Sequence, residues 1–389
     1  MASSLQEDLN FFGQSIPTTE EGLPRESFSQ KASLSWEGDS YQLESDYDLD
    51  EKQVYTCLYR NGALVLYQPA DLTLEQTHRP LAEQVLSVLQ QELDQLNAAL
   101  RLRSRIGKNP QFLNGLGLYF YSKNLWEEAH DLFRKAIERK SDFSEAYRNL
   151  SNVFLKLGLP EKSLQLLEMA VHLNPSFADL HNALAWVYLE CGQHADARTH
   201  LETAIGLNSR YYEAYLNLCL SYLQSCQHPD DGQHLPAPEE TLEILRKLAS
   251  QDDELKERLP KLTSWEDISR QYLILKDQQA RRDTTTIRAS CELIYIRYLK
   301  DRENLGGQSL KSFISWLSEK IAKGNNYADL RNYLGSFCLF WASYFVENAK
   351  HSFRKCVKAG YNLEQGRKRE KQIRRLEKSI KEISTRLLI

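Results

Sequence analysis

A pattern of residues that returns every 34 positions constrains this chain more than any other feature. Four successive units begin at Pro110, Ser144, Ala178 and Tyr212, and small, leucine and aromatic residues recur inside them at matching offsets. A fixed period of this length is typical of a repeat architecture, in which each unit buries its apolar side only by stacking on its neighbours. We therefore expect a solenoid of paired antiparallel helices, and we interpret the recurring apolar positions as its core.

These offsets resemble the tetratricopeptide repeat, whose pattern has an aromatic residue, Leu-Gly or a small residue, a second aromatic, and then Ala, Phe, Ala and Pro. In the first two units the resemblance rests on Leu116, Gly117, Phe120, Ala129, Phe133, Ala136, Tyr147, Leu150, Phe154, Gly158, Ala170 and Pro175. It implies a mainly α fold, an α-α superhelix with a concave surface. We expect four units over residues 107–250, the fourth with a polar loop insertion. The few Gly and Pro residues, 17 and 11 of 389, and the plain repeats favour a bacterial origin.

The N-terminal region is acidic, since residues 1–53 hold 12 Asp and Glu against 3 Lys and Arg. Residues 1–32 lack any periodicity, which predicts a disordered acidic arm. Residues 33–78 alternate polar and apolar positions and include Asn61-Gly62 between two β-rich runs. Asn-Gly in that place favours a type I′ hairpin turn. We therefore predict a small antiparallel β segment, and this second hairpin is the signal on which the prediction depends.

Three alternating carboxylates in this region, Asp46, Asp48 and Asp50, resemble the opening of a calcium-binding loop. That loop needs Gly at its sixth position and Glu at its twelfth. Here Glu51 and Cys57 occupy those positions. We therefore interpret this stretch as a solvated acidic linker.

Residues 79–106 predict one long amphipathic helix. Its apolar residues recur at steps of three and four, namely Leu81, Val85, Leu89, Leu93, Leu96 and Leu100. We expect this stripe to pack on the β segment or on the first repeat. A homodimer through the same helix is the alternative, because the helix spans more than three heptads.

The C-terminal third is less regular. Residues 251–325 predict an irregular helical region. In residues 326–389 we expect a degenerate fifth repeat, based on Leu334-Gly335, Ala349 and Phe353, followed by a basic helix that caps the array. That basic helix could also be a site for acid or phosphate. Nucleic acid is disfavoured, because the net charge of the chain is −4 and no aromatic residues interleave with the basic ones.

In the tetratricopeptide family the first helix of each unit lines the binding groove. Carried over residue by residue, this resemblance implies ligand contacts at Asn114, Tyr121, Arg148, Asn149, Asn152, Lys156, Asn182, Trp186, Glu190, Glu213 and Asn217. Further positions of the same kind are Leu118, Glu145, Asp179, Leu216 and Gln224. We call the first eleven residues the first-helix face. Trp186 could instead belong to the core.

One branch of the family binds the C-terminal carboxylate of a partner through a clamp of basic and Asn side chains. Arg148 and Asn152 match its first pair, whereas Ala183 replaces the next Asn. Glu213 and Asn217 replace its final basic pair. The clamp is incomplete, so we expect a partner peptide or amphipathic helix with mixed charges.

The sequence holds no Gly-rich phosphate loop, nucleophile elbow or His-Glu-x-x-His motif. We therefore expect neither an enzyme nor a bound cofactor. Cys226, His228 and His234 fit no zinc spacing, so no metal is expected. The start shows no secretory signal, no stretch is long enough to span a membrane, and seven scattered cysteines favour a reducing, cytoplasmic setting. The leading hypothesis is a non-catalytic adaptor that binds a partner protein. The alternatives are a regulatory protein with an N-terminal docking or sensing module, and an enzyme with its site in residues 251–325.

Overall fold

The computed structural model describes residues 29–48, 51–70, 80–209, 211, 213–215, 217–218, 221, 243, 284–322, 328–358, 371–376 and 378–379. Internal contacts divide the chain into two compact units. The first, which we call the sheet unit, comprises Met1–Gly107, Ser122–Asn124 and Thr284–Ile389. The second, the repeat unit, comprises Lys108–Tyr121 and Leu125–Asp283. Each unit is described by itself.

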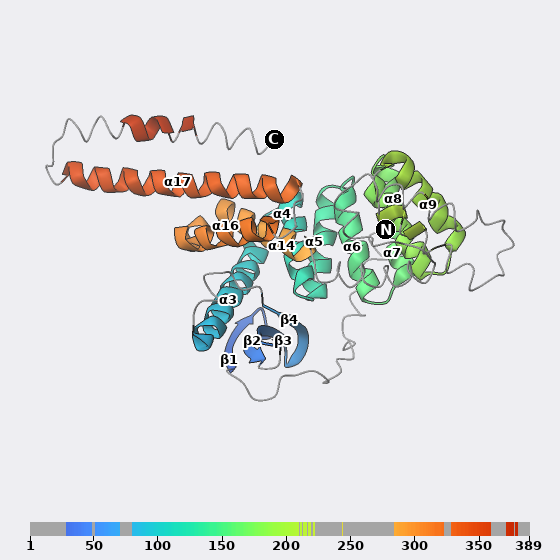
Figure 1. The fold of residues 1–389 in the computed structure, drawn as a ribbon, viewed down its shortest axis with the longest axis horizontal. Coiled ribbons are helices and arrows are strands. Elements are labelled where there is room, and N and C mark those ends of the chain that lie inside the picture. Colours follow the sequence, from blue (N-terminus) through green and yellow to red (C-terminus); the bar gives the residue numbers. More distant parts are fainter. Residues whose placement is uncertain are drawn as a thin grey trace. The chain divides into compact units, whose positions relative to one another are not determined.

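The repeat unit is built from successive antiparallel helix pairs (Figure 1). The helices are α4 (Pro110–Ser122), α5 (Trp126–Arg139), α6 (Ser144–Lys156), α7 (Pro160–Leu173), α8 (Ala178–Glu190) and α9 (His194–Leu207). In each pair the turn contains one residue with positive φ, and these residues are 34 positions apart: Asn124 at 57°, Gly158 at 71° and Gly192 at 72°. Gly and Asn tolerate this left-handed conformation, so the turn chemistry follows the same period as the core.

The small residues of the repeat allow close approach between helices. A Cβ atom added to Gly117 of α4 would lie 2.6 Å from a ring carbon of Phe133 on α5. Leu150 and Ala170 are buried in α6 and α7, as the resemblance implies for core positions. Ala185, Ala197, Leu201 and Ala204 share one apolar cluster between α8 and α9. The mainly α solenoid expected from the 34-residue period is therefore confirmed.

The sheet unit begins with a four-stranded antiparallel sheet in the order β1-β2-β3-β4. The strands are β1 (Ser29–Trp36), β2 (Asp39–Asp48), β3 (Gln53–Arg60) and β4 (Ala63–Pro69). The sheet thus starts before residue 33, where the expected arm was to end. The interpretation of Asp46 and Asp48 as parts of a solvated linker was wrong. Both lie in β2, because the residues between them and before them continue the polar–apolar alternation of a strand.

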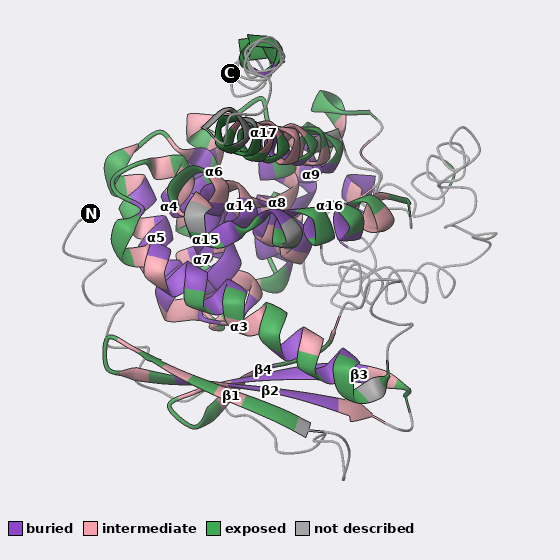
Figure 2. Ribbon diagram, turned by 90° about the vertical axis from the view of Figure 1, so that its left-hand side faces the viewer, coloured by how far each residue is buried: buried purple, intermediate pink, exposed green. Residues whose placement is uncertain are grey.

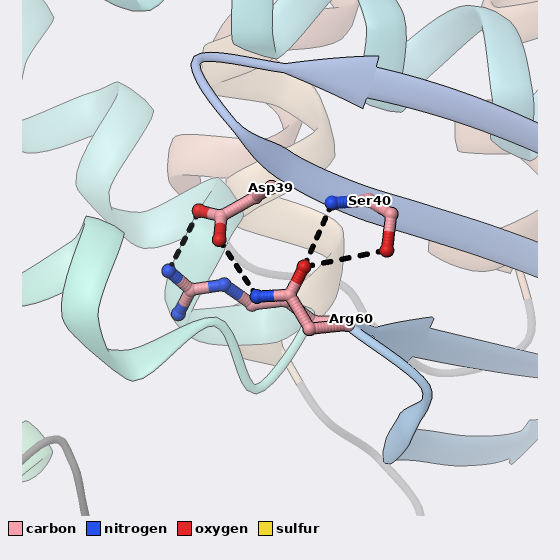
Figure 3. Close-up of polar contacts among 4 residues, drawn as sticks. Asp39, Ser40 and Arg60 are labelled. Atoms are coloured by element: carbon pink, nitrogen blue, oxygen red, sulfur yellow. Dashed lines mark hydrogen bonds and ion pairs between the residues drawn. The ribbon is translucent and has the colours of Figure 1, made fainter.

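Two tight turns lie at the same end of the sheet, and side chains connect them (Figure 3). Asn61 and Gly62 both have positive φ, as the Asn-Gly signal predicts. Arg60 Nη2 and Asn61 Nδ2 donate hydrogen bonds to the carboxylate of Asp39, at 2.9 and 2.7 Å. Asn61 Oδ1 accepts from the backbone N–H of Ser40 at 2.8 Å. Burial alone would raise the pKa of Asp39, but these bonds from Asn61 and Arg60 outweigh it and lower the pKa.

Helix α3 (Leu81–Arg105) packs on one face of the sheet, as expected for the long amphipathic helix (Figure 2). Its Val85 and Val88 form an apolar cluster with Val54 of β3. The dimer alternative for this helix stays a prediction. Among the described elements, α3 is the only helix that packs extensively on the sheet.

Helices from the far end of the sequence complete the sheet unit: α14 (Thr284–Lys300), α15 (Arg302–Leu305), α16 (Gly307–Ala322) and α17 (Ala328–Lys358). Their aromatic core includes Phe313, Phe337 and Phe340. Arg297 of α14 is only 1% exposed, and its Nη1 lies 2.9 Å from Asp94 Oδ2 of α3. A second pair joins Arg101 to Asp301 at 3.5 Å. These contacts link residues about two hundred positions apart in the sequence.

The expected helix pair of a fifth repeat is wrong, because residues 328–358 form the single continuous helix α17. Gly335 has open space around it and sits in the exposed part of the helix, where a glycine weakens the helix without ending it. The contacts also place this segment with the sheet rather than with the repeats. The polar insertion of the fourth unit and most of the basic final helix lie outside the described residues.

Candidate functional site

Asparagine side chains join successive units along the first-helix face. Asn149 Nδ2 of α6 donates to Asn114 Oδ1 of α4 at 2.9 Å, and both residues are 4% exposed. The same pairing recurs two units later, where Asn217 Nδ2 donates to Asn182 Oδ1 at 2.9 Å. These four of the eleven predicted residues are thus brought together in pairs. Because buried amides need partners, the pairs also fix how neighbouring first helices meet.

Between those two asparagine pairs, the chain places an ion pair. Arg148 Nη1 of α6 lies 2.7 Å from Asp179 Oδ2 of α8, and the Arg148 side chain is half-buried. The position next to Asn182 in α8 is Ala183, which has no side-chain amide to offer a ligand. Asp179 therefore neutralises the one basic residue that matched the carboxylate clamp. This arrangement agrees with an incomplete clamp.

Tyr211 is a residue of this face that sequence reasoning missed. Its hydroxyl accepts a hydrogen bond from Asn182 Nδ2 at 3.3 Å. Burial, with the nearby carboxylates of Glu213 and Asp179, raises the pKa of Tyr211, so the hydroxyl stays protonated. The signal was present in the sequence, because Phe143, Phe177 and Tyr211 precede successive units at steps of 34 residues.

The two large aromatic residues of the face are partly buried. Trp186 packs against the apolar cluster that α8 and α9 share. Tyr121 meets Trp126 edge to face, with ring centroids 5.1 Å apart. Each therefore contributes to the core while keeping part of its surface exposed. The contact with this cluster favours the core interpretation of Trp186, and the binding interpretation stays a prediction.

The remaining residues of the face give it mixed charge. Lys156 and Glu190 are exposed at the ends of α6 and α8, while Asn152 and Glu213 are half-buried. Both exposed groups stand at the last position of the first helix in their units. The face thus presents amide, cationic and anionic groups together with a partly exposed indole. Of the additional positions, Leu216 and Gln224 lie outside the described residues.

A pair of histidines lies beside this face and was also missed. His181 Nδ1 of α8 is 3.1 Å from His200 Nδ1 of α9, and His181 Nε2 lies 2.9 Å from the carbonyl oxygen of Pro175. A carbonyl only accepts, so His181 Nε2 carries a proton. Burial and the neighbouring His181 lower the pKa of His200. The pair is therefore built around a neutral His200 ring.

In the described part of the chain, no group of three or more His, Cys, Asp or Glu residues is arranged to hold a metal ion. Within the same residues, no helix combines the length and the apolar character needed to cross a membrane.

Comparisons with known proteins identify the repeats. Residues 93–142, 114–178 and 166–199 match family models described as tetratricopeptide repeat, so the chain contains tetratricopeptide repeats. None of the curated proteins matches its sequence.

Several solved structures are similar to the chain at low identity. MamA residues 41 to the end from Desulfovibrio magneticus RS-1 is 17% identical, with a TM-score of 0.35, covering 45% of this chain and 91% of that one. The first tetratricopeptide domain of Spaghetti (RPAP3), bound to the HSP90 peptide SRMEEVD, is 16% identical with a TM-score of 0.30, covering 30% and 94%. YrrB, a tetratricopeptide protein with an unusual peptide-binding site, is 18% identical with a TM-score of 0.30, covering 48% and 84%.

Proposed function

We propose that this chain, which carries tetratricopeptide repeats, is a non-catalytic scaffold whose first-helix face binds a peptide or amphipathic helix of a partner protein. One observation carries the proposal. Polar side chains on α4, α6 and α8 pair across successive units, and the same helices carry exposed charges of both signs and the partly exposed indole of Trp186. Trp and Arg are common anchors of protein interfaces.

The mixed charge of the face determines the kind of partner. Arg148 already pairs with Asp179, so a lone carboxylate would have to displace that pair. Lys156 and Glu190 remain exposed with opposite charges. A segment that carries one acidic and one basic residue near an apolar anchor would satisfy Lys156, Glu190 and Trp186 together.

The test is affinity capture with the full chain, comparing charge reversals on two faces of the repeats. Lys156→Glu and Glu190→Lys change exposed residues of the first-helix face and should leave the melting temperature unchanged. Glu202→Lys changes an exposed residue on α9 as the matched control. We expect a protein bound stoichiometrically by the wild type to be retained by Glu202→Lys and lost from both other variants. Equal retention by all four chains would contradict the proposal.

Trp186→Ala separates the two interpretations of that residue. If the variant keeps the wild-type melting temperature and loses the partner, Trp186 contacts the ligand. If the variant unfolds, Trp186 is a core residue. If it stays folded and keeps the partner, the binding face has been placed on the wrong residues.

A further inference from the structure

The sheet has two edge strands, β1 and β4, and their free edges are protected to different degrees. An unpaired edge presents a row of backbone N–H and C=O groups that can pair with a further strand. At β4, Asn124 Nδ2 donates a hydrogen bond to the backbone oxygen of Val65 at 2.9 Å, and Pro69 has no N–H to offer. The register of β3 and β4 also shifts at Leu58 and Tyr59. These features are typical of an edge that accepts no further strand.

The edge of β1 lacks these features. Its eight residues contain no proline and pair with β2 in one continuous register. The described elements that pack on β1 are β2 and α3, which leaves its outer edge open among the residues that the structure describes. Lys31 is the only charged residue of the strand, and its ion pair with Glu44 of β2, at 2.6 Å, turns the ammonium group inward.

The turn between β1 and β2 shows which backbone groups face the open edge. Glu37 and Gly38 both have positive φ, 51° and 96°, as a type I′ turn requires. Trp36 and Asp39 therefore form the hydrogen-bonded pair that closes the turn. Along an antiparallel strand, residues bonded to the neighbouring strand alternate with residues whose N–H and C=O point away from it. The residues of β1 whose backbone groups point to the open edge are thus Lys31, Ser33 and Ser35.

The apolar side chains of β1 are incompletely covered. Leu34 lies opposite Tyr41 of β2, which is on the same face as Tyr47 and thus on the side of the sheet that α3 covers. Tyr41 is only 1% exposed, whereas Ala32, Leu34 and Trp36 are half-buried. The apolar layer between the sheet and α3 therefore extends to the open edge.

Helix α3 carries two leucines on the flank beside this edge. Val88 clusters with Val54 of β3, so that side of α3 faces β3. Leu86 lies about 160° around the helix from Val88, because each residue turns the helix by about 100°. Since α3 packs on β1, β2 and β3, the side away from β3 is the side of β1. Leu86 is 42% exposed there, and Leu93, two turns later, is half-buried.

We propose that a second copy of this chain pairs with β1 through its own β1, antiparallel about a twofold axis at Ser33, so that the sheet continues from four strands to eight. The backbone groups of each Ser33 then bond to those of the other. The interface belongs to the sheet unit, so it is independent of the proposed function of the repeats.

The strand is self-complementary in this register. Ala32 lies opposite Leu34 of the second copy, and Lys31 lies opposite Ser35 of the second copy. Opposed residues of an antiparallel pair point to the same face, so apolar side chains meet beneath α3 and no like charges meet on the other face. The exposed Leu86 flanks of two α3 helices also come to the same junction. A strand from an unrelated protein would not supply that second flank.

A disulfide between two copies tests the register. In Ser33→Cys the new residue lies opposite itself, at the Cα separation of about 5.5 Å of a hydrogen-bonded pair, which a disulfide spans. In Ser35→Cys, the matched control on the same strand, the two new residues lie about 14 Å apart along the strands, at about 3.4 Å per residue. After mild oxidation of the full chain, we expect a cross-linked dimer on a non-reducing gel for Ser33→Cys. Ser35→Cys should not exceed the wild type, whose own cysteines set the background. Equal cross-linking of both variants, or none above the wild type, would overturn the proposal.

Sedimentation velocity tests the dimer without any new cysteine. We expect the wild type to sediment at twice the mass of one chain at micromolar concentration. Ser33→Pro removes an N–H that points away from β2, and Leu86→Glu places a charge on the flank of α3. Each should raise the dissociation constant of the dimer at least tenfold while the circular dichroism spectrum stays that of the wild type. Leu299→Glu, at an exposed leucine of α14, is the control and should leave the dimer intact. A monomeric wild type, or a dimer that Ser33→Pro leaves unchanged, would contradict pairing through β1.

Discussion

The repeat unit and the sheet unit both pair elements that are neighbours in the sequence, but the sheet unit also joins elements about two hundred positions apart. In the repeat unit, α6 packs on α7 and α8 packs on α9, so most contacts join neighbours in the chain. In the sheet unit, Asp94 pairs with Arg297 and Arg101 with Asp301. Contacts between neighbouring repeats produce a period in the sequence, because each repeat packs against the next through the same positions. Contacts between distant segments leave none, and only the folded structure reveals them.

The largest expected effect is a loss of stability caused by a substitution in the core of the repeat unit. Leu150 is buried in α6, so Leu150→Asp would place an unpaired carboxylate in the core. We expect a loss of about 3 kcal/mol or more in the free energy of unfolding. Urea-induced unfolding of the full chain, followed by circular dichroism, measures it. Gln165→Asp on the exposed side of α7 is the control and should change little; an equal, small effect of both would refute the register of the repeats.

The next largest effect is a loss of stability caused by a substitution in the sheet unit. Asp94→Asn leaves Arg297 buried without its counter-ion. Because Asp94 itself is 50% exposed, we expect a loss of about 2 kcal/mol rather than the larger values of fully buried pairs. Arg297→Met should cost less, since a buried apolar side chain needs no counter-ion. The double variant should resemble Arg297→Met alone; additive losses in urea unfolding would show that the two groups do not act as a pair.

A smaller change in stability tests how closely the two helices of a pair approach each other. Gly117→Ala would bring a Cβ atom to 2.6 Å from the buried ring of Phe133. Overpacking of this kind costs about 1–3 kcal/mol. Gly206 in α9 has open space, so Gly206→Ala should stabilise its exposed helix slightly. Melting temperatures that move in the same direction in both variants would count against close approach at Gly117.

The smallest expected effect is a difference between the two units in how their stability depends on pH. Unfolded His200 binds a proton near its ordinary value of 6.5, while the folded ring resists protonation, so the unfolded state binds more protons as pH falls. The repeat unit should therefore lose stability below pH 6.5, and His200→Gln should remove that dependence. The lowered pKa of Asp39 acts in the same direction in the sheet unit, but only near and below its ordinary value of 3.8. Melting temperatures of both chains between pH 7 and 5 provide the test.

The sequence predicted the repeats closely because their determinants are local. Leu150, Ala170 and Gly117 lie where the period places them. Asn61-Gly62 likewise identified its hairpin turn. In each case, residues within about 34 positions of one another determine the conformation.

The errors arose where local signals had two physical meanings. Asp46 and Asp48 were interpreted as a linker because carboxylates are typical of solvated loops, although they alternate with Tyr47 as a strand requires. Leu334-Gly335 was interpreted as the Leu-Gly position inside a degenerate repeat, but an exposed glycine is tolerated inside a long helix held by tertiary packing.

The candidate site likewise contains residues that the sequence predicted and residues that only the structure revealed. The resemblance supplied Asn114 and Asn149, which the structure pairs through their amides. It did not supply Tyr211, or the neutralisation of Arg148 by Asp179, because these depend on which side chains meet across units.

Hydrogen–deuterium exchange of Asp94→Asn tests the division into two units most directly. The account predicts faster exchange of backbone amides in α3 and, about two hundred residues away, in α14 and α15, with exchange in α6 to α9 unchanged. Faster exchange confined to α3, or spread equally over α6 to α9, would contradict it.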